Sequence, residues 1–138
     1  MTLYVLDASV ALAWCFEDEV SPVAELALDS LRTGEAFVPP IWQVEVGNAL
    51  LVAERRGRIK PAGTTRTLEL MRSLRIRLVE DGTGVDPGRL VTLGRNHALS
   101  AYDASYLALA MSEGLPLATL DSALRKAARK SGVPLVGE

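Results

Sequence analysis

Four acidic side chains occupy positions from which they could share one site: Asp7, Glu45, Asp103 and Asp121. Asp7 directly follows the apolar run 3–6, and Asp121 directly follows the run 117–120. Such short apolar runs are typical of strands that are buried on both faces. Because ligands of open parallel sheets bind beyond the carboxyl ends of the strands, we expect Asp7 and Asp121 to face such a site.

The other two acids fall within helical patterns. Glu45 shares its predicted helix face with Ile41, Asn48 and Val52, and we expect this face to be at least partly buried. Asp103 begins the stripe of the most apolar predicted helix in the chain. A carboxylate among apolar side chains is costly unless it is paired or coordinated.

Clustered carboxylates repel one another and take up protons unless a cation holds them together. No dedicated histidine or lysine accompanies these four acids in the sequence. The acids therefore suggest a divalent cation that prefers oxygen ligands, Mg²⁺ or Mn²⁺. Such a metal suits phosphodiester chemistry, because it lowers the pKa of a bound water and shields phosphate charge. A simpler alternative stays open, in which Asp7 and Asp121 only cap helices and Asp103 completes a capping box begun by Ser100.

Short apolar strands that alternate with longer helices must position these acids. We predict strands at 3–6, 37–38, 76–79, 115–120 and 134–136, and helices at 10–16, 23–31, 41–56, 61–74, 86–97, 100–113 and 121–130. This alternation is typical of an α/β fold, in which helices cover both faces of a parallel sheet.

Length and composition narrow the possibilities further. The chain has 138 residues and a net charge of −2, with 49% apolar and 23% charged residues. These values favour a single globular domain over residues 1–138. The lone Cys15 excludes an internal disulfide, and the lone His97 argues against a zinc site or a serine triad. We expect neither a signal peptide nor a membrane span, and therefore a cytoplasmic protein.

Four motifs in sequence carry a family resemblance: Asp7-Ala8-Ser9, Glu45-Val46-Gly47-Asn48, Ala101-Tyr102-Asp103-Ala104 with Tyr106-Leu107-Ala108, and Thr119-Leu120-Asp121. In this order they resemble the motifs of PIN-domain ribonucleases, and in particular the VapC toxins of toxin–antitoxin modules. The resemblance runs over residues 3–136. It implies a three-layer α/β/α sandwich whose parallel sheet has the order 3-2-1-4-5.

The resemblance also implies roles for the four acids, which would converge in one cleft. Asp7 and Asp103 would be the principal metal ligands, and Asp121 would complete the coordination directly or through water. Glu45 would bind metal or orient the attacking water. The implied activity is that of a metal-dependent endoribonuclease that leaves a 3′-hydroxyl and a 5′-phosphate.

Three further polar residues match positions of the resemblance. Ser9 and Thr119 would hold the carboxylates and metal waters in place. Asn48 would contact the cleft or a phosphate. The VapC resemblance implies two protein partners as well, a small antitoxin that offers a basic side chain to the acids and a second copy of the chain in a homodimer.

The basic residues gather in two parts of the sequence. Without the four acids, 15 bases stand against 13 remaining acids, and eight of those bases lie within residues 55–77. This segment could contact an RNA backbone, or it could simply be a solvated helix face. A second basic set follows on the last predicted helix: Arg125, Lys126, Arg129 and Lys130. Among the aromatic residues, Trp14, Trp42 and Tyr106 are expected in the core, whereas Tyr102 fits either a core or a base-stacking role.

Two other functions compete with the nuclease. A PIN-like module could bind RNA or protein without cutting, although no motif position has lost its acid. A phosphotransfer domain could form an aspartyl phosphate at Asp7. Ser9 argues against that function, because the corresponding phosphatase motif has a second aspartate there, and no strand-end lysine matches the receiver pattern. Dinucleotide binding is disfavoured because no G-x-G-x-x-G follows the first strand.

Overall fold

The computed structural model describes residues 2–19, 21–80 and 86–138, in which four parallel strands form the central sheet. The strands are β1 (Leu3–Leu6), β2 (Glu35–Val38), β3 (Ile76–Leu78) and β4 (Leu117–Ala118), in the order β3-β2-β1-β4. Leu135 adds a single parallel bridge to Leu117 beyond β4. The predicted order is therefore confirmed, but the expected fifth strand at 134–136 is reduced to one bridge.

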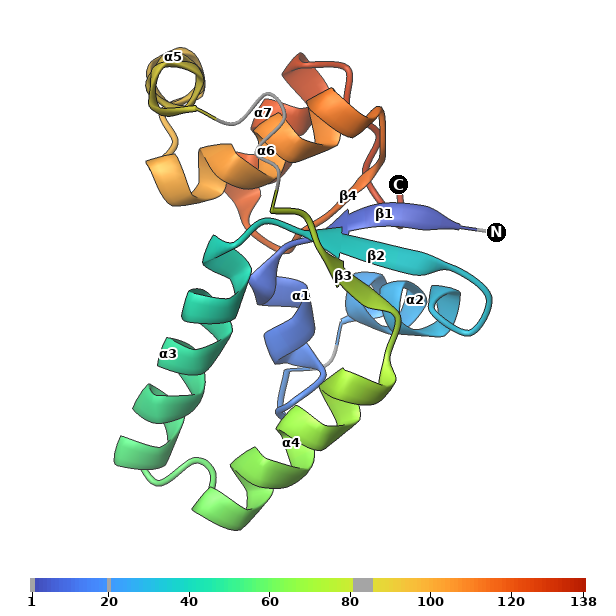
Figure 1. Cartoon of the computed structure of the whole chain (residues 1–138), viewed down its shortest axis with the longest axis vertical. Helices are drawn as coiled ribbons and strands as arrows, with labels where there is room; N and C mark the ends of the chain where they lie inside the picture. Colours follow the sequence, from blue (N-terminus) through green and yellow to red (C-terminus); the bar gives the residue numbers. More distant parts are fainter. Residues whose placement is uncertain (1, 20, 81–85) are drawn as a thin grey trace.

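Helices cover both faces of this sheet. Figure 1 shows α1 (Ala8–Ala13), α2 (Pro22–Ser30), α3 (Ile41–Arg55) and α4 (Pro61–Ser73) on one side. The other side carries α5 (Pro87–His97), α6 (Ala101–Glu113) and α7 (Ser122–Lys130). The fold is thus the expected three-layer α/β/α sandwich. Among the described residues, no helix is long and apolar enough to cross a membrane.

The largest differences from the predicted boundaries lie around β4 and α1. The run 115–120 forms a strand only at Leu117–Ala118, because Pro116 lacks an N–H for the ladder although its carbonyl accepts from Val5 N at 2.8 Å. After Ala118 the chain turns toward α7. Helix α1 begins at Ala8 instead of residue 10 and ends at Ala13 instead of residue 16. One residue, Asp7, therefore separates β1 from α1, and residues 119–121 separate β4 from α7.

The core is built on β1 and α6. Tyr4, Val5 and Leu6 are fully buried in β1, and residues 104–110 of α6 are all buried. A helix that is buried all round is held on every side by packing. As expected, Trp42 and Tyr106 are buried, and Trp14 is partly buried. Because α6 is packed along residues 104–110, its packing holds the polar residues on this helix in position.

Candidate functional site

Asp7 occupies the turn between β1 and α1. It stands at the N-cap position of α1 in an extended conformation, but its side chain makes no capping hydrogen bond. Its Oδ2 atom instead accepts hydrogen bonds from Ser9 Oγ at 2.6 Å and from Thr119 Oγ1 at 2.7 Å. The residue is only 5% exposed. The capping explanation therefore fails for the Asp7 side chain, whose carboxylate lies between Ser9 of α1 and Thr119 after β4.

The environment of Asp7 disfavours its charged form. Burial raises the pKa of the Asp7 carboxyl above its ordinary value, and the nearby charge of Glu45 raises it further. Hydrogen bonds from Ser9, Thr119 and the Ala8 amide lower the pKa without cancelling these effects. Among the described residues, the groups that act on this carboxyl are hydroxyls, an amide and another acid. A bound cation would supply the missing positive charge.

Two hydroxyls join the turn after β1 to the turn after β4. Thr119 is fully buried, and its Oγ1 atom also accepts from Asp121 N at 3.1 Å. Ser9 Oγ accepts from Leu120 N at 3.0 Å. Asp121 stands at the N-cap of α7, where its side chain makes no capping bond, and it is half-buried. The backbone contacts of the Thr119 turn thus place Asp121 at the same edge of the sheet as Asp7.

Asp103 enters the site from the first turn of α6. Ser100 caps this helix by accepting from Asp103 N at 3.1 Å, so the capping prediction is correct for the Ser100 hydroxyl. Burial raises the pKa of the Asp103 carboxyl, as do the charges of Asp121 and Asp7, while a hydrogen bond with Ser100 lowers it. The charged form of Asp103 is therefore disfavoured by its burial and by the two other aspartates of the site.

Glu45 meets the site from α3, on the opposite face of the sheet from α6. Its Oε1 atom accepts a short hydrogen bond from the hydroxyl of Tyr106, and the Tyr106 side chain is fully buried. Burial and this bond both raise the pKa of Tyr106. From the sequence, Tyr106 was expected only in the core, and its contact with Glu45 was missed. The signal that could have revealed it is a tyrosine three residues after Asp103 on an apolar helix. Asn48 is exposed, so the expectation of a partly buried side chain there is wrong.

The donor set fits an open metal site better than a closed cage. Within 2–19, 21–80 and 86–138, no three histidine, cysteine or acidic side chains lie close enough to hold a metal together. Mg²⁺ commonly takes one or two carboxylates and keeps several waters. Carboxylates that repel one another on adjacent turns suit this partly hydrated coordination, in which metal-bound water would link the cation to the more distant carboxylates.

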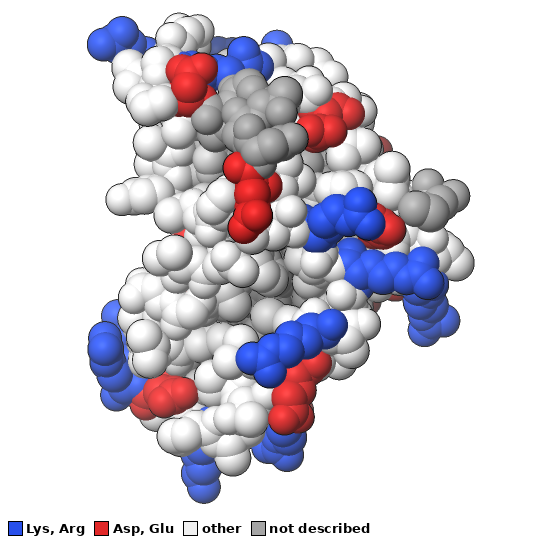
Figure 2. Space-filling view, viewed as in Figure 1, with Lys and Arg blue, Asp and Glu red and all other residues white. Residues whose placement is uncertain are grey.

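The basic residues are distributed over the surface. All eight lysine and arginine residues within 55–77 are exposed. Some are engaged already: Arg58 pairs with Asp18 and Glu19, and Arg77 pairs with Glu35. Figure 2 shows basic side chains interspersed with acids over this face of the molecule. Tyr102, beside Asp103, is 61% exposed, which excludes a core role for its ring.

Comparisons with known proteins agree with this architecture. The sequence matches the family described as PIN domain over residues 4–130, whereas no curated protein matches the chain. PAE2754 from Pyrobaculum aerophilum is 26% identical, with a TM-score of 0.70 over 98% of this chain and 84% of that one. VapBC2 from Rickettsia felis, solved with a promoter DNA fragment, is 16% identical, with a TM-score of 0.67 over 97% of both chains. A toxin–antitoxin complex from Klebsiella pneumoniae is 18% identical, with a TM-score of 0.56 over 83% of this chain and 82% of that one.

Proposed function

Because this chain belongs to the PIN-domain family, we propose that it is a metal-dependent endoribonuclease and the VapC-type toxin of a toxin–antitoxin pair. The observation that carries the proposal is the buried carboxylate of Asp7, which is held by two hydroxyls and coupled electrostatically to Glu45 and Asp103. A purely structural aspartate would be expected to use its charge for a helix cap or an ion pair. Asp7 instead lies buried next to other acids, where its charged form is disfavoured.

Asp7 and Asp103 would hold the cation, Mg²⁺ or Mn²⁺, with Asp121 joining them directly or through water. When bound, the cation would lower the pKa of a coordinated water and shield the charge of the phosphodiester. Both hydroxyls that contact Asp7 bind its Oδ2 atom, so we expect its Oδ1 atom to face the metal. Ser9 and Thr119 would thereby fix the orientation of this ligand.

Glu45 would act on the attacking water. Tyr106 holds the Oε1 atom of Glu45, which leaves Oε2 to accept a proton as the water oxygen approaches phosphorus. The bond to the 3′-oxygen breaks as the bond to water oxygen forms, and the products carry a 3′-hydroxyl and a 5′-phosphate. Asn48 is exposed on the same helix, and we propose that it contacts a phosphate of the substrate.

The toxin assignment rests on the motif resemblance together with the folds of the Klebsiella and Rickettsia complexes. We propose that an antitoxin presents a basic side chain to the acids, where it would replace the cation as the compensating charge. A homodimer completes the proposed assembly. Cognate antitoxin should therefore inhibit cleavage and compete with Mn²⁺ for binding.

The test is an RNA cleavage assay with the purified chain in Mg²⁺ or Mn²⁺, with and without chelator. Asp7→Asn should abolish cleavage, whereas Asp29→Asn, a control at an exposed acid paired with Arg32, should cut like the wild type. Full activity in Asp7→Asn, or cleavage that survives the chelator, would overturn the proposed mechanism. RNA binding without products in either metal would identify a non-catalytic module, and phosphorylation of Asp7 by acetyl phosphate would identify a phosphotransfer domain.

A further inference from the structure

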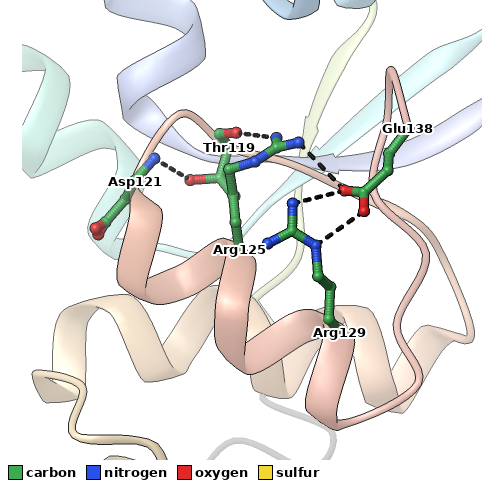
Figure 3. Close-up of polar contacts among 5 residues, drawn as sticks. All are labelled: Thr119, Asp121, Arg125, Arg129 and Glu138. Atoms are coloured by element: carbon green, nitrogen blue, oxygen red, sulfur yellow. Dashed lines mark hydrogen bonds and ion pairs between the residues drawn. The ribbon is translucent and has the colours of Figure 1, made fainter.

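Arg125 contacts the turn that carries Thr119 and Asp121. It lies on α7, one turn after Asp121, and its Nη1 atom donates to the Thr119 carbonyl oxygen at 2.9 Å. Its side chain is only 19% exposed. Figure 3 shows the guanidinium beside Thr119, whereas the Asp121 carboxylate points away from it. Arg125 therefore contacts the backbone of the site and not the Asp121 carboxylate.

Several hydrogen bonds of the site meet at Thr119 and at the residue that follows it. Its hydroxyl contacts both Asp7 Oδ2 and the Asp121 amide, while the next amide, that of Leu120, reaches Ser9. A rotation of the peptide after Thr119 would disturb all of these bonds together. The bond from Arg125 to the Thr119 carbonyl opposes such a rotation.

Arg125 is held on its other side by Glu138. Its Nη2 atom lies 3.3 Å from Glu138 Oε2, and Arg129 contacts the same carboxylate at 2.8 and 3.0 Å. The bond from Arg129 holds the pKa of Glu138 below its ordinary value, so the carboxylate stays charged. These contacts are drawn together in Figure 3. The planar guanidinium thus spans a carbonyl and a carboxylate, which a lysine ammonium cannot do in the same geometry.

We propose that Arg125 is a positioning residue for the metal site: it locks the Thr119 carbonyl and thereby sets the orientation of Asp7 and Asp121. Glu138 orients Arg125 in turn. The role in catalysis rests on the proposed nuclease function, whereas the effect on the turn does not. The competing role for a basic residue here is a phosphate contact to RNA, and the two roles predict different measurements.

The first test measures amide hydrogen exchange by NMR in the whole chain without RNA. In Arg125→Gln, exchange of the Leu120 and Asp121 amides should be about tenfold faster or more, because local opening of the turn becomes easier. Amides within α7, such as that of Ala127, should keep their rates and so report an intact fold. Lys126→Gln removes the same charge from an exposed neighbouring residue and should leave the Leu120 and Asp121 rates unchanged. Unchanged Leu120 and Asp121 rates in Arg125→Gln would overturn the proposal.

The second test measures Mn²⁺ binding by calorimetry and the kinetics of RNA cleavage. Arg125→Gln should weaken Mn²⁺ binding about tenfold, as is common when a supporting contact behind a metal ligand is lost. It should lower kcat while KM changes little, and Arg125→Lys should recover only part of the loss. A raised KM, a smaller salt dependence and unchanged Mn²⁺ binding would show instead that Arg125 contacts RNA phosphate.

Two further outcomes keep the two proposals separate. If the wild type cuts no RNA but Arg125→Gln alters amide exchange and Mn²⁺ binding, the nuclease proposal fails while the positioning of the turn stands. If Arg125→Gln does not fold, Glu138→Gln replaces it, because that variant keeps the Thr119 contact and removes the charge with which Arg125 and Arg129 both pair. It should accelerate Asp121 amide exchange about twofold, and an unchanged rate would refute the orienting role of Glu138.

Discussion

Thr119 and Asp7 stand 112 positions apart in the chain, yet a 2.7 Å hydrogen bond joins their side chains. The parallel pairing of β1 with β4 makes this contact possible, because it brings the carboxyl ends of the two strands together. The backbone repeats the connection, since Asp7 N donates to the Ala118 carbonyl at 3.0 Å. The hydroxyl that orients Asp7, the most buried acid of the site, therefore comes from the residue that directly follows β4.

Replacing Thr119 by valine should test that connection. The variant keeps the side-chain shape but removes one of the two hydroxyl bonds to Asp7 Oδ2, where the bond from Ser9 remains, and the hydroxyl partner of the Asp121 amide. We expect a cost of about 1–3 kcal/mol in unfolding free energy. Cleavage and Mn²⁺ affinity should fall about 10- to 100-fold. Thr92→Val is the matched control, because Thr92 bonds only the Gly88 carbonyl within α5. Equal losses in both variants would contradict the role of Thr119.

Asp7→Asn should separate stability from activity. Since burial raises the pKa of Asp7 in the folded protein above its value in the unfolded chain, ionisation of this carboxyl destabilises the metal-free fold. That destabilisation is absent below the unfolded pKa and develops as pH rises through the folded pKa. The melting temperature of the metal-free variant should match the wild type at low pH and exceed it at neutral pH. A variant less stable at neutral pH would contradict this account.

Tyr106→Phe should show whether the tyrosine hydroxyl serves Glu45. The ring stays in the core, so thermal stability should change little, while kcat should fall about tenfold because Glu45 loses a bond that orients it. Tyr4→Phe is the control, because the Tyr4 hydroxyl is also buried but donates to the Ala27 carbonyl, far along the chain from the acids. An unchanged kcat in Tyr106→Phe would show that Tyr106 contributes only to the packing of the core.

The single cysteine should react slowly with alkylating reagents. Burial, with a smaller effect from the charge of Glu19, raises the pKa of the Cys15 thiol to about 11. Compared with its ordinary value of 9.0, the thiolate at pH 8 is about 100-fold less abundant. Iodoacetamide should therefore label the folded chain much more slowly than the urea-unfolded chain, and the rate should rise with pH toward about 11. Equal labelling rates in the two states would show that the thiol is exposed.

Local patterns in the sequence were sufficient to predict a parallel sheet covered by helices, with Asp7 and Asp121 after two of its strands, whereas the strand order came from the motif resemblance. The motif resemblance implied that Thr119 would hold a carboxylate, but neither pattern nor resemblance predicted that Tyr106 would bond Glu45, since that contact depends on how the layers pack. The exposed Asn48 shows the limit of helical periodicity, which places residues on a face without saying how far a neighbour covers it. Arg125 was identified only as one of a basic set on the last helix, and its bond to the Thr119 carbonyl could not be predicted from that charge pattern.

The order in which the chain is synthesised gives one more consequence of the pairing between β1 and β4. A ribosome makes Asp7, Glu45 and Asp103 before it reaches Thr119, so a growing chain holds three of the four acids without the hydroxyl that orients the first of them. The emerging protein therefore cannot complete its site until the last strand of the sheet has docked beside the first.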